Sequence, residues 1–262
     1  MERNPLDVAA ILAPTFEVLR WLLPALFVIT LLKTRWAKGH IGELLVRVFA
    51  HWKLDRNVYR RLHNVTLNTL DGTTQIDHVF LSRYGVFVLE TKNMTGWIFG
   101  SEKQAQWTQN IYKRTFKFQN PLRQNYKHLK ALEATLAIDP AHLHSVITFV
   151  GGSTFKTAMP PNVTKGIGFV RYIRSFREPV FSEAQVDAFT EALQTGRRAP
   201  TLATHREHVQ NLQRRSDPTA ERICPKCGSS LLVREAKSGA NIGSKFWGCS
   251  TYPKCRFTQK LL

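Results

Sequence analysis

The chain has 262 residues, a length that suits one medium-sized globular domain with smaller attachments rather than a single small domain. Its 37 lysine and arginine residues against 19 aspartate and glutamate residues give a formal net charge of +18, which requires a polyanionic partner or surface. Nucleic acid is the leading candidate, because basic side chains that neutralise phosphates release counterions, and anionic lipid is the second.

Residues 1–38 are predicted to form a membrane anchor. The chain is mostly apolar from Val8 to Leu32, and a helix that spans a bilayer needs about 20 such residues. Glu17 and Arg20 interrupt the stretch, but their spacing lets them pair on one helix face. Basic residues follow Leu32, so the positive-inside rule predicts a single-pass protein of the cell (inner) membrane whose soluble domains face the cytoplasm. A buried or interfacial helix is the alternative.

Residues 39–195 are expected to fold as one mixed α/β domain. Apolar residues recur with a helical period after the anchor, and the period then changes to two, which is typical of strands. Asn120-Pro121 opens a second helix, and a capping box formed by Ser182 and Gln185 opens a third. The expected elements are a helix over 40–52, strands over 62–70, 75–82 and 85–92, a helix over 120–137, strands over 146–150 and 167–170, and a helix over 182–196.

Residues 196–222 are predicted to be a basic linker. They are polar, contain the pairs Arg197-Arg198 and Arg214-Arg215, and include prolines at positions 200 and 218. This composition is typical of a segment that joins two folded parts.

All four cysteines lie in residues 223–262, as the pairs Cys224 with Cys227 and Cys249 with Cys255. Thiolates with this spacing can reach one tetrahedral zinc ion at about 2.3 Å. Four sulfur ligands and no open position predict a structural zinc site that folds a small ribbon. Two disulfides are the alternative, but oxidised secreted scaffolds distribute cysteines differently.

The residues around the cysteines resemble a known family. Cys224-Pro225-Lys226-Cys227-Gly228 opens the segment, and Gly243 to Ser250 and Tyr252 to Phe257 add glycine, aromatic and proline residues. This pattern resembles the C-terminal four-cysteine zinc fingers of type IA DNA topoisomerases and implies binding of single-stranded DNA. Aromatic faces stack on bases at about 1–3 kcal/mol each while cations follow the backbone, although the aromatic residues can instead form the ribbon's core. The candidate DNA-binding residues are Lys226, Lys245, Phe246, Trp247, Tyr252, Lys254, Arg256 and Phe257.

Two neighbouring predicted strands carry a candidate catalytic site. Strand alternation places Glu90 and Lys92 on one face, and Asp77 on the preceding strand can share a divalent cation with Glu90. Carboxylate oxygens suit Mg²⁺ or Mn²⁺, which activates water and stabilises the charge that develops on a scissile phosphate. Lys92 would orient or deprotonate that water, or hold the phosphate. The alternative is a structural salt-bridge network.

Several short motifs around this site occur in a fixed order. They are Gly42-Glu43, Gln75-Ile76-Asp77-His78, the stretch from Gly85 to Asn93, Gly96-Trp97-Ile98, Trp107 and Asn120-Pro121-Leu122-x-Gln124. The set resembles the NERD (nuclease-related) domain, which is similar to the PD-(D/E)xK and restriction-type endonucleases, whose core is a mixed sheet flanked by helices. The resemblance implies that Asp77, Glu90 and Lys92 are the metal-binding and catalytic residues. It implies that Glu43 is an acidic residue of the first helix and Gln124 a polar helix residue near the site; a solvated charge and a surface amide are the respective alternatives.

These features predict a membrane-tethered, Mg²⁺-dependent nuclease whose zinc ribbon binds DNA. The first alternative is a non-catalytic DNA-binding or tethering protein with an inactive nuclease-like scaffold, and recognition of anionic lipid by the basic surface is the second. No nucleotide cofactor is expected, because Gly151-Gly152 and Gly166-x-Gly168 lack the remainder of a phosphate-binding loop.

Overall fold

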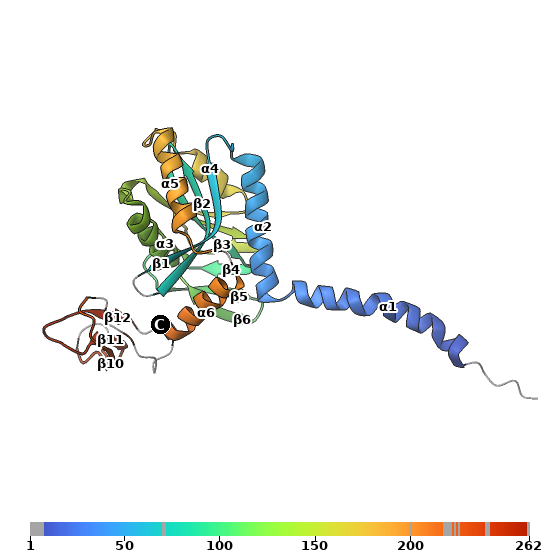
Figure 1. Ribbon diagram of the computed structural model, residues 1–262. Helices are drawn as coiled ribbons and strands as arrows, with labels where there is room; N and C mark the ends of the chain where they lie inside the picture. The colour runs from blue at the N-terminus through green and yellow to red at the C-terminus, as the bar shows by residue number, and fades with distance from the viewer. Residues whose placement is uncertain are drawn as a thin grey trace, which may run out of the picture.

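A computed structural model describes residues 8–69, 72–199, 201–216, 222, 224, 226–238 and 242–260, and the side chains of residues 1–16 lie outside the described part. Six α-helices and one 3-10 helix are present within these residues, and Figure 1 shows their arrangement. The α-helices are α1 (Val8–Leu32), α2 (Arg35–Lys53), α3 (Pro121–Leu136), α4 (Gly168–Arg174), α5 (Glu183–Gly196) and α6 (Leu202–Ser216), with the 3-10 helix η1 at Pro140–His142. The strands are β1 (Arg60–Thr69), β2 (Gly72–Ser82), β3 (Gly85–Asn93), β4 (Gly96–Phe99), β5 (Gln106–Ile111), β6 (Arg114–Gln119), β7 (Leu143–Val150), β8 (Ser153–Phe155), β9 (Val163–Lys165), β10 (Leu231–Glu235), β11 (Lys245–Cys249) and β12 (Thr258–Lys260).

A five-stranded mixed sheet forms the centre of the main domain, with strand order β1-β2-β3-β7-β9. Strands β1, β2 and β3 are antiparallel, whereas β7 runs parallel to both β3 and β9. Val86 and Val88 of β3 pack in the core with α3 and α5. Phe87 and Leu89 pack in a second core with α2 and α4. The alternation along β3 therefore places helices on both faces of the sheet, which confirms the predicted mixed α/β domain with a sheet flanked by helices.

Local signals in the sequence account for the ends of α3 and α5. The Asn120 side chain accepts a hydrogen bond from the backbone N–H of Leu122, and Pro121 occupies the first turn of α3, where its missing N–H costs nothing. The predicted capping box at Ser182 and Gln185 is present at the start of α5. Leu132 of α3 is fully buried, and burial of such a side chain stabilises the fold by about 1.5–3 kcal/mol.

A second sheet of four strands, ordered β6-β5-β4-β8, packs beside the first and was not predicted from the sequence. The buried Trp107 ring of β5 stacks on Phe149 of β7, with ring centroids 6.1 Å apart, so aromatic packing joins the two sheets. A Cβ atom on Gly100 would lie 2.3 Å from the Trp107 ring, so only glycine fits there. The Asn120 amide donates to three backbone carbonyls of the loop before β5, including that of Gln104 at 2.7 Å. Trp107 and Asn120 therefore have structural roles.

Two predicted segments differ from the structure. The expected strand over 167–170 is wrong, because Gly168–Arg174 forms α4. Its buried residues Phe169, Val170 and Ile173 follow a helical spacing, and a short apolar run does not distinguish a strand from a helix by periodicity alone. The range 196–222, predicted to be a linker, contains helix α6, which packs against β2.

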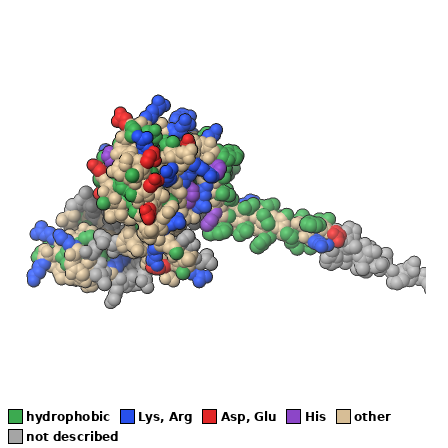
Figure 2. Space-filling view, turned by 45° about the horizontal axis from the view of Figure 1, so that its top comes forward, with side chains coloured by type: hydrophobic (Ala, Val, Ile, Leu, Met, Phe, Trp, Pro, Cys, Tyr) green, Lys and Arg blue, Asp and Glu red, His purple; other side chains and the backbone are tan. Residues whose placement is uncertain are grey.

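Residues Val8 to Leu32 form a helix, α1, that projects away from the main domain (Figure 1). Its described side chains are largely apolar and exposed (Figure 2), and Arg20 lies 4.0 Å from Glu17, as their spacing predicted. Among the residues that the structure describes, no helix has the length and hydropathy needed to cross a membrane. The predicted anchor over residues 1–38 is therefore not confirmed, and part of it lies outside the described side chains.

Candidate active site and metal centre

The candidate active site lies where strands β2 and β3 separate. Their pairing runs from Ser82 opposite Gly85 to His78 opposite Leu89 and ends there. Asp77 directly precedes His78 on β2, and its Oδ2 accepts a hydrogen bond of 2.9 Å from the backbone N–H of Thr91. The Asp77 carboxylate therefore accepts the hydrogen bond that a backbone carbonyl of a paired strand would accept, and this bond holds the side chain against β3.

Glu90 of β3 is the centre of a hydrogen-bonded network. Its Oε1 accepts from Lys92 Nζ at 2.7 Å and from Gln124 Nε2 at 2.7 Å. Lys92 Nζ also donates to Gln124 Oε1 at 2.9 Å, which closes a triangle between β3 and α3. Glu90 is only 3% exposed, so this network holds a buried charge with its counter-charge. The structure brings these three predicted residues together.

His128 of α3 completes the surroundings of Glu90 and was missed in the sequence. Its Nε2 lies 3.4 Å from Glu90 Oε2, and its Nδ1 lies 2.8 Å from the hydroxyl of Thr74. A usable signal was present, because His128 follows Gln124 by four residues and such residues share one helix face. His78, the last residue of the motif Gln75-Ile76-Asp77-His78, is fully buried beside His63 on the other side of the sheet from His128.

The two carboxylates have opposite electrostatic environments. Burial raises the pKa of Asp77 well above its ordinary value, and the neighbouring Glu90 charge raises it further. Burial also raises the pKa of Glu90, but the Lys92 ammonium and the His128 imidazole outweigh that effect and lower it to about 2. Glu90 is therefore ionised at neutral pH, whereas the fold opposes ionisation of Asp77. Pairs of acids with separated pKa values are concentrated at functional sites.

A cleft of about 490 Å³ opens beside Asp77 and Gln124. The half-buried Glu43 of α2 lines this cleft, where burial raises its pKa and Arg47 Nη2 lies 3.7 Å from its Oε2. The cleft therefore contains the predicted Glu43, although on the side formed by α2. Its other lining residues are His40, Asn64, Thr66, Gln75, Thr201, Thr204 and His208.

Helix α6 and the residues before it form one wall of this cleft. The backbone N–H of Arg198 donates to the carbonyl of Thr66 at 2.9 Å, and its guanidinium makes two bonds of 2.6 Å to Glu207. His208 Nδ1 lies 2.9 Å from the hydroxyl of Thr73 on β2. These contacts hold the segment against the sheet, so residues expected to form a linker contribute to the site.

The donor atoms around Asp77 fit a divalent cation in type. Glu90 Oε2 is buried and its neighbour His128 Nε2, at 3.4 Å, does not complete a hydrogen bond to it. Ionisation of Asp77 is unfavourable, and a bound cation would relieve that charge. The acids are not gathered into a compact cluster, however. In the described part of the chain, Cys224, Cys227, Cys249 and Cys255 are the only group of three or more metal-binding side chains whose donor atoms all lie within 4.8 Å of one another.

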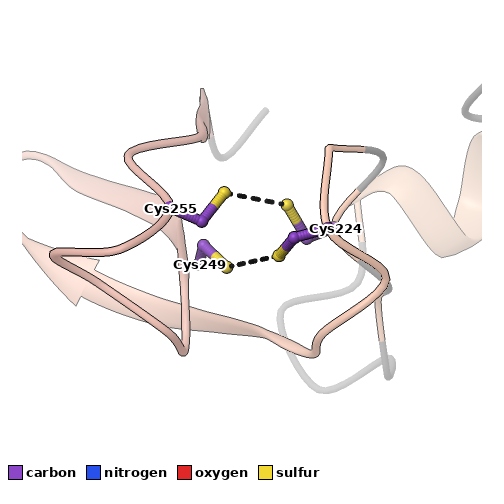
Figure 3. Close-up of side chains that lie close together, drawn as sticks. Cys224, Cys249 and Cys255 are labelled. Atoms are coloured by element: carbon purple, nitrogen blue, oxygen red, sulfur yellow. Dashed lines mark hydrogen bonds between the residues drawn. The ribbon is translucent and has the colours of Figure 1, made fainter.

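The four cysteines form a metal-binding cluster at one end of the C-terminal sheet (Figure 3). Cys224 Sγ lies 3.7 Å from Cys255 Sγ, and Cys227 Sγ lies 3.4 Å from Cys249 Sγ. Tetrahedral zinc with bonds of about 2.3 Å requires sulfur atoms about 3.8 Å apart, so these side chains fit the ion. A hydrogen bond from the backbone of Ser229 lowers the pKa of Cys227 to about 5, which favours the thiolate.

The predicted DNA-binding residues of the ribbon fall into two groups. Trp247 is 3% exposed and packs in the small core with three of the cysteines, and Phe246 and Phe257 are half-buried. Tyr252 is 59% exposed, and the Arg234 guanidinium lies 5.8 Å from its ring centroid. The remaining members are exposed cations: Lys226, Lys245, Lys254 and Arg256.

Comparison with known proteins finds a family match for each of the two parts of the chain. Residues 38–150 match the family described as the nuclease-related domain. The chain therefore carries a NERD domain. Residues 221–262 match the family described as the topoisomerase DNA-binding C4 zinc finger, so a ribbon of that type follows the NERD domain. No solved structure matches the chain.

Three relatives illustrate the two parts. An uncharacterised protein of Bacillus anthracis is 57% identical over 97 residues, which is 37% of this chain and 45% of that protein. DNA topoisomerase 1 of Methanocaldococcus jannaschii is 63% identical over 41 residues, which is 16% of this chain and 5% of that enzyme. DNA topoisomerase 1 of Archaeoglobus fulgidus is 50% identical over 38 residues, which is 14% of this chain and 5% of that enzyme. The chain thus spans less than half the length of each of these relatives.

Proposed function

We propose that the protein hydrolyses DNA phosphodiester bonds in a metal-dependent reaction at Asp77, Glu90 and Lys92, and that its zinc ribbon holds the DNA. The observation that carries the proposal is the buried Glu90–Lys92–Gln124 triangle next to Asp77, at the edge of an open cleft in a NERD domain. A salt bridge that only stabilised the fold would not require a second carboxylate whose ionisation the fold opposes.

Glu90 and Lys92 have complementary roles in this proposal. Glu90 is ionised at neutral pH and fixes the Lys92 ammonium at 2.7 Å. An ammonium has three N–H donors, and Lys92 uses two of them on Glu90 and Gln124. The third donor can bind a phosphate oxygen or orient the attacking water.

Asp77 and Glu90 would hold the divalent cation, with Glu43 across the cleft. Bound Mg²⁺ or Mn²⁺ would activate water and neutralise negative charge on the phosphate. The Thr91 backbone N–H orients Asp77 toward β3, and Gln124 keeps Glu90 and Lys92 in contact. The zinc ribbon adds affinity through the exposed Tyr252 ring and the cations around it.

Metal binding separates this proposal from a non-catalytic DNA-binding protein. We expect Mn²⁺ titrated into the zinc-loaded protein to bind at one additional site and to lose that site in Asp77→Asn and in Glu90→Gln. Glu133→Gln is the matched control, because it removes a half-buried carboxylate that pairs with Lys130 on α3, the helix of Gln124. If the wild type binds zinc but no Mn²⁺, the result would favour a non-catalytic DNA-binding protein with an inactive nuclease-like scaffold.

Attachment to the inner membrane, with the soluble domains in the cytoplasm, remains a proposal. It is supported by the exposed apolar side chains of α1, including Trp21 and Phe27, and by Lys33 and Lys38 after the apolar stretch. Flotation with liposomes tests it. The full chain should float with vesicles and a chain lacking residues 1–34 should not; equal flotation of both would assign lipid binding to the basic surface instead.

A further inference from the structure

A second cavity, of about 440 Å³, lies beside the candidate active site and is strongly basic. We call it the arginine pocket and define it by Arg47, Arg56, Arg60, Arg61, His51 and His63. Helix α2, the loop after it and strand β1 supply these six residues. Among the described residues that line the cavity, none is an aspartate or a glutamate.

Part of the positive charge in the arginine pocket has no carboxylate partner. Arg60 lies 3.1 Å from Asp187, and Arg47 lies 3.7 Å from Glu43. Arg56 and Arg61 have no carboxylate within 4.0 Å in the described part of the chain; Arg56 contacts His51, and Arg61 donates to the carbonyl of Leu54. Two guanidinium groups therefore lie near each other without a carboxylate, and burial and the charge of Arg56 lower the pKa of Arg61, so an anion would be favoured between them.

The pocket also contains unsatisfied hydrogen-bond donors. The Nε atoms of Arg47 and Arg61 are buried, and neither has a hydrogen-bond partner. Buried donors without partners are rare in folded proteins and destabilise them. Phosphate oxygens match the planar donor pattern of guanidinium groups, so an anion that enters the pocket can bind the outer nitrogens of its arginines.

His63 reports the same excess of positive charge. Burial lowers its pKa, and the nearby Arg47 and Arg61 lower it further, to about 4. The imidazole is therefore neutral at neutral pH, and its Nδ1 lies 2.8 Å from that of His78. His63 therefore adds no positive charge at neutral pH, and the charge beside it comes from Arg47 and Arg61.

The arginine pocket and the catalytic cleft share two elements. On α2, Glu43 lines the cleft and Arg47, one turn later, lines the pocket. On β1, His63 lines the pocket and the next residue, Asn64, lines the cleft. The φ of 52° at Asn64 interrupts the alternation of the strand, so these consecutive side chains need not point to opposite faces of the sheet. The two cavities are therefore adjacent, within reach of one flexible polyanion.

We propose that the arginine pocket binds a backbone phosphate of the same DNA strand whose phosphodiester lies at Asp77 and Glu90. This inference rests on the proposed function, and it adds a site that positions the strand beside the reacting group. A lipid headgroup is disfavoured by position: the loop of Arg56 follows the end of α2 opposite to α1, and a helix of 19 residues spans about 28 Å. The pocket is therefore remote from the apolar helix.

The test measures DNA binding without cleavage. A labelled single strand of 16 nucleotides is titrated into the zinc-loaded full chain at several salt concentrations, with no divalent cation added. The variants are Arg56→Gln/Arg61→Gln, the charge-preserving Arg56→Lys/Arg61→Lys, and the control Lys113→Gln/Arg114→Gln, which removes two charges from the β5–β6 hairpin. Thermal unfolding of each variant verifies that it folds, and inorganic pyrophosphate is titrated separately.

Loss of this phosphate contact would reduce the slope of log K against log salt by about 0.7, the value per phosphate for single strands. We expect this reduction in the glutamine pair, retention of the slope in the lysine pair, and no change in the hairpin control. An unchanged slope in a folded glutamine pair would overturn the inference. So would loss of pyrophosphate binding with DNA affinity intact, which would indicate a small phosphate ligand. Because cleavage is not measured, an inactive Asp77–Glu90 site would leave these outcomes interpretable.

Discussion

At the scale of single residues, the candidate site separates the ionisation of two neighbouring carboxyl groups. Glu90 gains Lys92 and His128 as partners, whereas Asp77 gains one backbone N–H and the repulsion of Glu90. Both carboxyl groups are buried, but the ionised form is stabilised at Glu90 and destabilised at Asp77. A divalent cation would relieve the strain, so metal affinity and domain stability should be coupled through Asp77.

Replacement of Asp77 by asparagine should stabilise the metal-free protein at pH 7. The fold raises the pKa of Asp77 above its unfolded value of 3.8, so ionised Asp77 destabilises the native state; this destabilisation shrinks as pH falls below the folded pKa and is absent below 3.8. Asparagine removes the charge and keeps an oxygen for Thr91. Calorimetry should show a rise of about 2–4 °C in Tm for each kcal/mol gained. A lower Tm in the variant would show that Asp77 is a structural partner.

Glu90 should show the opposite dependence on pH. Its pKa falls from 4.5 to about 2 on folding, so its contribution to stability is present above pH 4.5 and is lost as pH falls toward 2. Urea unfolding should therefore find Glu90→Gln clearly less stable than the wild type at pH 7, with a difference that shrinks at pH 3. Glu133→Gln serves as the control at each pH. A constant difference between wild type and Glu90→Gln would contradict the assigned pKa.

At the scale of elements, the sequence was informative where a segment has one buried face. Helices α2, α3 and α5 and strands β1, β2 and β3 were predicted because their apolar residues recur with a clear period. Strands β5 and β6 are short, with a single buried side chain between them, and α6 is strongly polar. Their formation depends on tertiary contacts such as the stacking of Trp107 on Phe149, which no local pattern reveals.

Two glycines of α2 provide a matched test of how that helix is placed. A Cβ on Gly42 would lie 2.8 Å from Cβ of Asn93 on β3, whereas a Cβ on Gly39 meets nothing within 4 Å. We expect Gly42→Ala to cost about 1–3 kcal/mol by overpacking and to displace the adjacent Glu43. Gly39→Ala should instead stabilise the protein by about 0.5–1 kcal/mol through helix propensity. Chemical denaturation measures both, and equal effects would show that α2 is not held against β3.

At the scale of the whole molecule, motif order predicted Glu90, Lys92 and Gln124 as neighbours, and the structure places them in contact. The pairing of Gln124 with Glu90 joins residues 34 positions apart and could be inferred only through a family resemblance. The wall formed by α6 and the shared use of α2 and β1 by the two cavities arise from chain packing. Sequence periodicity carries no information on such contacts.

The two folded parts of the molecule should respond separately to loss of zinc. Cys249→Ser removes one of four ligands, so the ribbon, which depends on its metal for folding, should lose its structure while the main domain keeps its cooperative transition. Hydrogen exchange would locate the loss in residues 222–260. Affinity for single-stranded DNA should fall at least about fivefold, since one stacked base contributes about 1–3 kcal/mol. Unchanged affinity would assign DNA binding to the main domain alone.

The most direct test of the account is cleavage of labelled single- and double-stranded DNA by the full chain in Mg²⁺ or Mn²⁺, compared with metal-free buffer. The wild type and Glu133→Gln should cleave only with metal, and Asp77→Asn and Glu90→Gln should lose at least about 100-fold in rate, the scale of one group that acts only in the transition state. The two inactive variants should still bind DNA. Intact DNA with bound wild-type protein in every metal would contradict a nuclease and support a tethered DNA-binding protein.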